Sequence, residues 1–389
     1  MGFYFGFTTE LVAIAAMGAV QCHFGYLANS LIKKHLPAVP ARLSCAAVRT
    51  VVATLALGLV LSVPNASQLP LTPFLGWLRG ISLLWAFASS VSWLVYRVLR
   101  WVRGRSVETD PTRRALLRTA GAAAVGAPFA LVGFGAFIER TAFRIREIDI
   151  PIAGLHPDLE GLRLAQISDI HLSPFLSERE FARVVDAANG LRAHVMLVTG
   201  DLISVHGDPL DACLDQISRL RADAGVLGCL GNHEIYARTE QYTAVQAARM
   251  GVWFLRGQVR RLRFGNAQLN IGGVDYQKMN ARAHYLRGAE EMLLPGALNV
   301  LLSHNPDVFP VAARQGWDLT ISGHTHGGQV NFEILHRGLN VARFYTPYVY
   351  GLYSAARSSI YVTRGIGTIG MPARLGAPPE ISVLRLRKA

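Results

Sequence analysis

Five short segments of the sequence combine the carboxylate, imidazole and amide side chains that bind metal ions. In chain order they are Ser168-Asp169-Ile170-His171, Gly200-Asp201, Gly231-Asn232-His233-Glu234, Ser303-His304-Asn305 and Gly323-His324-Thr325-His326. Taken alone, a Gly-Asp pair usually marks a turn or a helix cap, and a single histidine usually has a structural role. Five of the twelve histidines fall in these segments, however, and this clustering favours one metal site over several unrelated structural roles.

The donor types match the chemistry of a site that holds two metal ions. Asp169 and His171 are one residue apart, so alternation along an extended chain sends both side chains to the same side. The two carboxylate oxygens of Asp201 can bridge two ions about 3.5–4 Å apart. Mixed His, Asp and Asn donors without cysteine suit Mn, Fe or Zn rather than a structural zinc site. Two such ions generate hydroxide from water at neutral pH and neutralise a phosphoryl group under attack.

The same segments closely resemble the calcineurin-like metallophosphoesterase family, whose pattern D-x-H, G-D, G-N-H-[DE], H and G-H-x-H is complete here. The resemblance covers about residues 148–389 and implies a four-layer α-β-β-α sandwich, an α/β fold with the site at the carboxyl ends of its strands. It also implies a first metal held by Asp169, His171, Asp201 and His326, and a second held by Asp201, Asn232, His304 and His324. By the same resemblance, His233 faces the scissile phosphate as a general acid or transition-state donor and is not a ligand. Glu234 stands where the family more often has Asp. This difference concerns the residue that, by the resemblance, would help to hold His233 in position.

Two further stretches resemble one branch of that family, the membrane-anchored bacterial and animal metallophosphoesterases. They are Gly323-His324-Thr325-His326-Gly327-Gly328-Gln329-Val330 and the stretch from Tyr361-Val362-Thr363-Arg364 to Pro378-Pro379-Glu380. Some relatives hydrolyse UDP-2,3-diacylglucosamine in lipid A biosynthesis, so the resemblance implies a phosphorylated, lipid-linked substrate. Arg364 is a candidate for binding the substrate phosphate, with a structural ion pair as the alternative.

Short β-rich runs that alternate with amphipathic segments place these motifs at strand ends. We expect buried strands over residues 162–168, 195–199, 226–230, 269–274, 300–303 and 319–322, and helices over residues 178–191, 210–220 and 241–250. Each strand ends near a Gly, Asp or His, which is the usual position of a site in a layered α/β fold. We therefore expect a metallophosphoesterase domain over residues 159–389, preceded by a connector over residues 140–158.

The composition excludes a wholly soluble chain. Of the 389 residues, 51% are hydrophobic and 17% are charged, whereas a typical soluble domain has about 25% charged residues. A net charge of +13 would suggest a nucleic-acid partner if it were spread evenly. Residues 1–146, however, carry 15 Lys and Arg against 4 Asp and Glu, and the remainder is close to neutral. The basic excess lies beside apolar segments, which argues for a membrane and against nucleic acid.

Four apolar runs within residues 1–139 predict about four transmembrane helices. They cover residues 11–32, 50–63, 80–96 and 119–138, and a bilayer core about 30 Å thick needs roughly 20 such residues. Basic residues gather after the first and third runs, which predicts that the catalytic domain lies on the periplasmic side of the inner membrane. Arg113-Arg114 before the fourth run resembles a twin-arginine export signal, and an ordinary basic flank is the alternative. A fourth run that does not cross would leave the domain in the cytoplasm.

Several alternatives stay open at this point. Five aromatic residues after the last histidine motif either pack locally against the site or meet lipid head groups; they are Phe344, Tyr345, Tyr348, Tyr350 and Tyr353. Cys213 and Cys229 are expected as buried thiols, with a disulfide as the alternative in an exported domain. The alternative functions are an exported phosphodiesterase or phosphatase acting on phospholipids or small phosphodiesters, and an inactive membrane scaffold, which the complete ligand pattern disfavours.

Overall fold

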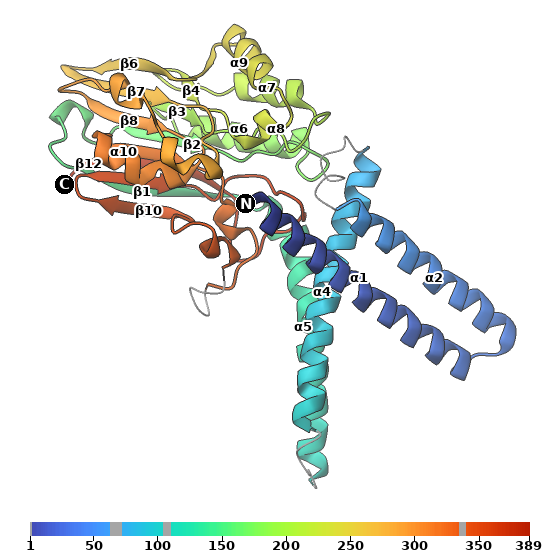
Figure 1. Ribbon diagram of the computed structural model, residues 1–389. Helices are drawn as coiled ribbons and strands as arrows, with labels where there is room; N and C mark the ends of the chain where they lie inside the picture. The colour runs from blue at the N-terminus through green and yellow to red at the C-terminus, as the bar shows by residue number, and fades with distance from the viewer. Residues whose placement is uncertain (1, 63–71, 104–109, 334–339) are drawn as a thin grey trace. The chain divides into compact units, whose positions relative to one another are not determined.

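The computed structural model of the chain describes residues 2–62, 72–103, 110–333 and 340–389. The chain divides into two compact units. One comprises Met1–Ile138 together with Gly370–Ala373, and the other comprises Glu139–Ile369 together with Arg374–Ala389. Long helices make up most of the first unit, and the second contains all the strands found among the described residues (Figure 1).

Among the described residues, the first unit contains four long helices. They are α1 (Gly2–His35), α2 (Ala38–Val60), α4 (Pro73–Arg103) and α5 (Pro111–Phe137). Each is long and apolar enough to cross a membrane, which confirms the expectation of about four such helices. Helix α5 begins at the cap residue Asp110, whose Oδ1 accepts a hydrogen bond from the backbone N–H of Thr112 at 2.8 Å.

Helix α2 begins earlier than the apolar run predicted. The run starts at residue 50, whereas the helix starts at Ala38 and therefore includes Arg42 and Arg49. A search for apolar runs stops at a charged residue, but a long arginine side chain can stay in a membrane helix by reaching toward water. The two arginines belong to the second helix and not to the connection before it. The predicted end of the run at Val63 lies outside the described residues.

Two six-stranded sheets form the second unit. Their strand orders are β1-β12-β2-β3-β4-β5 and β10-β11-β9-β8-β7-β6. The first sheet contains β1 (Arg144–Ile152), β2 (Arg163–Ile167), β3 (Val195–Val198), β4 (Val226–Gly228), β5 (Val252–Phe254) and β12 (Glu380–Lys388). The second contains β6 (Gln258–Phe264), β7 (Ala267–Gly273), β8 (Leu298–Leu302), β9 (Leu319–Ser322), β10 (Gly351–Ala355) and β11 (Ser358–Val362). Strands β2 to β5 run parallel to one another, as do β7, β8, β9 and β11.

Helices cover the outer face of each sheet, which gives four layers in the order α-β-β-α (Figure 1). The helices are α6 (Glu178–Gly190), α7 (Leu210–Ser218) and α9 (Glu240–Arg249) on the first sheet, and α10 (Phe309–Gln315) on the second. Apolar side chains of both sheets meet in the middle, among them Leu164 and Leu197 from one and Leu269 and Ile321 from the other. Strands buried on both faces form unbroken apolar runs in the sequence. The predicted fold class is confirmed.

Strand β1 lies where the sequence analysis placed a connector, over residues 140–158. It pairs in parallel with β12, and its Ile150 and Ile152 are buried in the core between the sheets. Isoleucines at every second position from Ile148 were the signal for a strand with one buried face. Asp149 and Pro151 lie between these isoleucines and hide that signal in a search for apolar runs, because such a search requires consecutive apolar residues.

The two cysteines of the second unit are buried thiols, as their apolar surroundings predicted. Neither Cys213 nor Cys229 is in a disulfide. Burial raises the pKa of both thiols, so both stay protonated and unreactive at neutral pH.

Candidate metal centre

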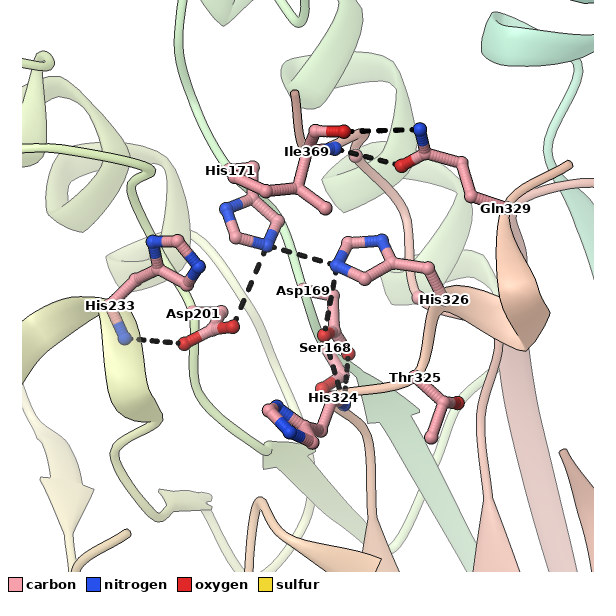
Figure 2. Close-up of polar contacts among 12 residues, drawn as sticks. Ser168, Asp169, His171, Asp201, His233, His324, Thr325, His326, Gln329 and Ile369 are labelled. Carbon is pink, nitrogen blue, oxygen red and sulfur yellow. Dashed lines mark hydrogen bonds and ion pairs between the residues drawn. The ribbon is translucent and has the colours of Figure 1, made fainter. Parts of the chain in front are cut away.

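The metal-ligand segments follow the carboxyl ends of parallel strands in both sheets. Asp169 follows β2, Asp201 follows β3, and Asn232 begins the short helix α8 (Asn232–Tyr236) after β4. His304 follows β8, and the segment with the last two histidines follows β9. Parallel strands end at a common edge of their sheet, so the two sheets bring the five segments together. Figure 2 shows Asp169, Asp201, His233 and His326 near one another.

One group of three ligand atoms comes from Asp169, His171 and His326. Nε2 of His171 lies 3.1 Å from Nε2 of His326, which in turn lies 3.4 Å from Oδ1 of Asp169. All three side chains are buried, and Figure 2 shows the two imidazole rings facing each other above the carboxylate. Two ring nitrogens and a carboxylate oxygen directed at one point form a donor set for a divalent ion.

A second group comes from Asp201, His304 and His324. Oδ2 of Asp201 lies 3.0 Å from Nε2 of His304 and 3.6 Å from Nε2 of His171, so this carboxylate faces both groups. Oδ1 of Asn232 is buried and has no hydrogen-bond partner among the described residues. An unpaired buried amide oxygen is costly unless a ligand satisfies it. The donor types and this unpaired oxygen fit a centre that binds metal.

The backbone takes left-handed angles at five of the predicted ligands. The φ angles are 51° at Asp169, 48° at His171, 56° at Asp201, 77° at His324 and 52° at His326. Asp and His enter this region more readily than most residues, but it remains uncommon for any residue with a side chain. Such angles persist only where the surrounding structure imposes them, and they concentrate at functional sites. The fold therefore holds these ligands in place against the local preference of the chain.

Two glycines allow the ligand loops to approach one another. Gly200 has a φ of 89°, and a Cβ atom at this position would lie 2.5 Å from the backbone nitrogen of Gly231. A Cβ atom on Gly231 would lie 2.1 Å from Oδ1 of Asp201. Both distances are far below van der Waals contact, so only glycine permits this packing of the two loops.

Burial and charge together set the protonation of the cluster. Burial lowers the pKa of His171 and of His324 to about 3, so both rings are neutral at pH 7 and offer free lone pairs. Burial opposes ionisation of Asp201, but the charges of His304 and His233 outweigh it and hold the pKa of Asp201 well below its usual value. Burial likewise opposes charge on His304, yet Asp201 raises its pKa to about 10. His304 must therefore release a proton before its Nε2 can bind a metal ion.

His233 lies beside the bridging position. Its backbone N–H donates to Oδ1 of Asp201 at 2.9 Å, and its Nδ1 lies 2.5 Å from the backbone oxygen of Ser204. A carbonyl oxygen can only accept, so Nδ1 carries the hydrogen and Nε2 is the atom available for chemistry. His233 also forms a third group of neighbouring ligand atoms with His171 and Asp201, so its position permits a ligand role as well as proton transfer.

Glu234 holds the backbone of the segment around Asp201. Its buried carboxylate accepts hydrogen bonds from the backbone N–H groups of Asp201 at 3.1 Å, Leu202 at 2.6 Å and Gly231 at 2.7 Å. Burial raises the pKa of this carboxyl group. The sequence analysis connected Glu234 with the support of His233, whereas these contacts fix the loop that carries the shared carboxylate.

Arg364 forms the structural ion pair that the sequence analysis named as an alternative. Its Nη1 donates to Oε2 of Glu380 at 2.7 Å, and its guanidinium carbon lies 4.0 Å from the centre of the Tyr350 ring. The side chain is 11% exposed. A role in binding substrate phosphate stays a prediction for this residue.

Arg374 contacts a predicted ligand, although no metal-binding motif includes it. The side chain is fully buried, its Nη1 donates to the backbone oxygen of His326 at 3.3 Å, and its Nη2 lies 3.3 Å from Nδ1 of the same histidine. Its Nε donates to the backbone oxygen of Gly367 at 3.0 Å. A buried guanidinium that contacts both the backbone and the ring of a ligand restricts the orientation of that ligand.

Tyr276 is a second residue that the motifs missed. The centre of its ring lies 5.4 Å from that of His324 and 6.1 Å from that of His304, and the residue is buried. Burial raises the pKa of its hydroxyl group, which therefore stays protonated at neutral pH. It follows β7, and its closeness to these histidines depends on the pairing of β7 with β8, which no local pattern reveals.

The sequence of this chain is similar to those of several known proteins. Residues 162–328 match the family described as Calcineurin-like phosphoesterase. A Bos taurus protein named "Transmembrane protein with metallophosphoesterase domain" is 30% identical over 311 residues, which cover 76% of this chain and 68% of that protein. The protein of the same name from Danio rerio is 28% identical over 257 residues, covering 63% and 58%. The "Uncharacterized metallophosphoesterase YkuE" of Bacillus subtilis is 27% identical over 273 residues, covering 69% and 94%.

These similarities agree with the motifs of the second unit and with the candidate membrane helices of the first. The matched family region spans the motif segments from Asp169 to His326. The names of the first two relatives agree with the four candidate membrane helices, although the chain spans only about half to two thirds of the length of those relatives. The chain belongs to the calcineurin-like metallophosphoesterase family, and it is a membrane protein of this family of metal-dependent phosphoester hydrolases.

Proposed function

We propose that the chain is a dinuclear phosphoesterase or pyrophosphatase anchored in the membrane. In this proposal Asp169, His171, Asp201 and His326 hold one ion, and Asp201, Asn232, His304 and His324 hold the other. The observation that carries it is the carboxylate of Asp201, which faces ligand atoms of both groups. Donors without thiolate support Mn, Fe or Zn as the metals.

The chemistry divides between the ions and the side chains. When bound, two divalent ions would supply an activated water and would neutralise charge on a phosphoryl group under attack. His233 is placed to move a proton at Nε2, because Ser204 occupies its other ring nitrogen. Glu234 and Arg374 restrict the loops that carry Asp201 and His326, and this restriction keeps the ligands in place without reorganisation during the reaction.

The substrate we propose is phosphorylated and lipid-linked, and UDP-2,3-diacylglucosamine is the specific compound to test first. Four candidate membrane helices in the same chain support a substrate that resides in a membrane. Residues 147–389 carry 24 Lys and Arg against 22 Asp and Glu, so the bound metals rather than a basic surface would attract the phosphate. Nucleic acid, which binds through an extended basic face, is accordingly not proposed as a partner.

The charges around the membrane helices favour a second candidate function. Basic residues flank the end of α4 and the start of α5, among them Arg100, Arg103, Arg113 and Arg114. By the positive-inside rule this connection is cytoplasmic, and the second unit then lies on the periplasmic side of the inner membrane. An exported phosphodiesterase or phosphatase acting on phospholipids or small phosphodiesters is the function that this topology favours.

Hydrolysis by the full chain tests both candidates. The protein is purified in detergent, stripped of metal, and assayed with Mn, Fe or Zn against bis-p-nitrophenyl phosphate. UDP-2,3-diacylglucosamine, phosphatidyl lipids and cyclic nucleotides are then compared by kcat/KM. We expect no turnover without metal and the highest kcat/KM for a lipid-linked compound. Equal turnover without metal would contradict the metal-dependent site, and a preference for cyclic nucleotides would contradict the lipid-linked substrate.

A further inference from the structure

A short helical turn of the catalytic unit presents apolar side chains to solvent. This turn, η7 (Val341–Phe344), continues into Tyr345. Phe344 is 82% exposed, Tyr345 is 63% exposed and Val341 is 62% exposed. Single exposed apolar residues are ordinary on protein surfaces, but three of them within five positions form a patch that needs an explanation.

The turn is anchored firmly, so the exposure is not a result of loose structure. Asn340 is 1% exposed; its Oδ1 accepts a hydrogen bond from the backbone N–H of Ala342 at 3.0 Å, and its Nδ2 donates to the backbone oxygen of Gly327 at 3.2 Å. Arg343 donates from Nε to Oε1 of Glu333 at 2.5 Å. The polar side chains of the segment thus point inward to fixed partners, while its apolar side chains point outward.

The other aromatic residues of the same segment are packed within the domain. The Tyr348 ring lies edge-on to Phe309 and to Tyr353, with ring centres 5.5 Å and 5.3 Å apart. Tyr350 lies under the guanidinium of Arg364 and donates from its hydroxyl to Glu333. Local packing, one of the two alternatives for these aromatic residues, is therefore the arrangement of Tyr348, Tyr350 and Tyr353. Phe344 and Tyr345 are not packed in this way and stay open to the other alternative, contact with lipid head groups.

We propose that Val341, Phe344 and Tyr345 insert into the interfacial layer of the lipid bilayer that holds the helices of the same chain. The chain carries four helices able to cross a membrane, so its catalytic unit is covalently tied to a lipid surface. Aromatic side chains are enriched at the level of the lipid head groups, where an apolar ring and a polar hydroxyl are both accommodated.

Such a contact would position the metal centre as well as the turn. Asn340 ties the turn to Gly327, which directly follows His326 in the last motif. A Cβ atom on the next residue, Gly328, would lie 2.0 Å from Oδ1 of Asn340, so the turn and the ligand loop are in close contact. Insertion would therefore hold the loop with His324 and His326 beside the bilayer surface. The value of this placement for hydrolysis rests on the proposed lipid-linked substrate, whereas the insertion itself does not.

Fluorescence of a single labelled position tests the insertion directly. The four cysteines at 22, 45, 213 and 229 are replaced by serine or alanine, Phe344→Cys is introduced, and the full chain is labelled with a polarity-sensitive fluorophore. The protein is reconstituted in vesicles of phosphatidylethanolamine and phosphatidylglycerol that contain head-group spin-labelled lipid. We expect blue-shifted emission and strong quenching. The matched control is Val245→Cys on α9, an exposed apolar position of the same unit that should show solvent-like emission and little quenching.

Two outcomes would overturn the proposal. Emission of the Phe344 probe as solvent-like as that of the Val245 probe would show that the turn stays in water. Blue-shifted emission without quenching by the lipid label would show that a protein, such as a second copy of the chain, covers the turn instead. Hydrolysis of bis-p-nitrophenyl phosphate by each labelled variant is the folding control, and it separates failure of the insertion from failure of the proposed function.

A second variant gives the same answer without a label on the aromatic residues. In a Val341→Cys background, Phe344→Ser with Tyr345→Ser should remove most of the lipid quenching of the probe. Hydrolysis of the soluble aryl ester should stay unchanged, because neither residue is in the metal centre. Quenching that persists in full after both substitutions would contradict a role for these two rings.

Discussion

Asp201 is the residue that connects the two groups of ligand atoms in the proposed metal centre. Its Oδ2 faces His304 of one group and His171 of the other, and its Oδ1 accepts a hydrogen bond from the backbone of His233. Glu234 accepts hydrogen bonds from three backbone N–H groups, one of which is that of Asp201, and these bonds fix the loop that carries Asp201. A single carboxylate thus connects both groups of ligand atoms with the residue proposed to move a proton.

His233→Asn separates proton transfer from metal binding. The asparagine amide can still donate to Ser204, but it has no atom that can exchange a proton in place of Nε2. We expect unchanged metal content and a loss of about 10²–10⁴ in kcat toward an aryl phosphodiester. Mass spectrometry of bound metal and steady-state kinetics check the two parts. Loss of a metal ion would assign His233 as a ligand, the role that its closeness to His171 and Asp201 also permits.

Glu234→Ala tests the support of the loop that carries Asp201. It leaves three buried backbone N–H groups without their carboxylate partner, each at a cost of about 1–3 kcal/mol. We expect a clearly lower melting temperature and weaker metal binding, measured on the detergent-solubilised chain. Asp215→Ala, which removes an exposed carboxylate on α7, is the control and should change neither. A melting temperature of Glu234→Ala equal to that of the control would contradict the supporting role.

At the scale of elements, the site depends on how closely the loop after β3 approaches the loop after β4. Gly231→Ala would place a methyl group 2.1 Å from Oδ1 of Asp201, and such overpacking costs about 1–3 kcal/mol. We expect loss of metal binding, because the shared carboxylate must move. Gly190→Ala in α6 is the matched control, since its added Cβ would meet no atom within 4 Å. Metal content measured for both variants decides the point, and equal metal content would show that the loops tolerate separation.

The elements that the sequence predicted well are those whose signals are local. Strands β2 and β3 are short apolar runs followed by the predicted ligands Asp169 and Asp201, and both the run and the ligand are visible within ten residues. Strand β1 was missed because its exposed face is charged, and only its pairing with β12 buries the other face. Arg374 lies in a stretch that resembles the membrane-anchored branch, but its contact with His326 comes from tertiary packing that no local pattern reveals. The same holds for Tyr276 beside His324.

At the scale of the whole molecule, the excess of basic residues lies mainly in the unit that contains the candidate membrane helices. The basic excess lies in residues 1–146, and the catalytic unit is close to neutral. The two arginines now placed within α2 shorten the first connection, while Lys33, Lys34 and His35 remain in the last turn of α1. The arginines in the end of α4 and in the start of α5 therefore carry most of the topology argument.

A reporter fused after Ala389 tests that topology. Alkaline phosphatase is active only when exported, and a green fluorescent protein exported in unfolded form does not fluoresce. We expect phosphatase activity and no fluorescence, because arginines cluster in the end of α4 and in the start of α5. The opposite pair of results would place the catalytic unit in the cytoplasm, and a membrane substrate facing the cytoplasm would then be required.

The most direct test of the account is the number of metal ions bound per chain, measured together with hydrolysis. Full-length protein and its Asp201→Ala variant are stripped of metal and reloaded with Mn, Fe or Zn, and bound metal is counted alongside turnover of bis-p-nitrophenyl phosphate. We expect two ions per wild-type chain with metal-dependent turnover, and fewer than two ions with turnover abolished in Asp201→Ala. A variant that keeps both ions and the wild-type rate would contradict the central claim that Asp201 is shared by a dinuclear hydrolytic centre.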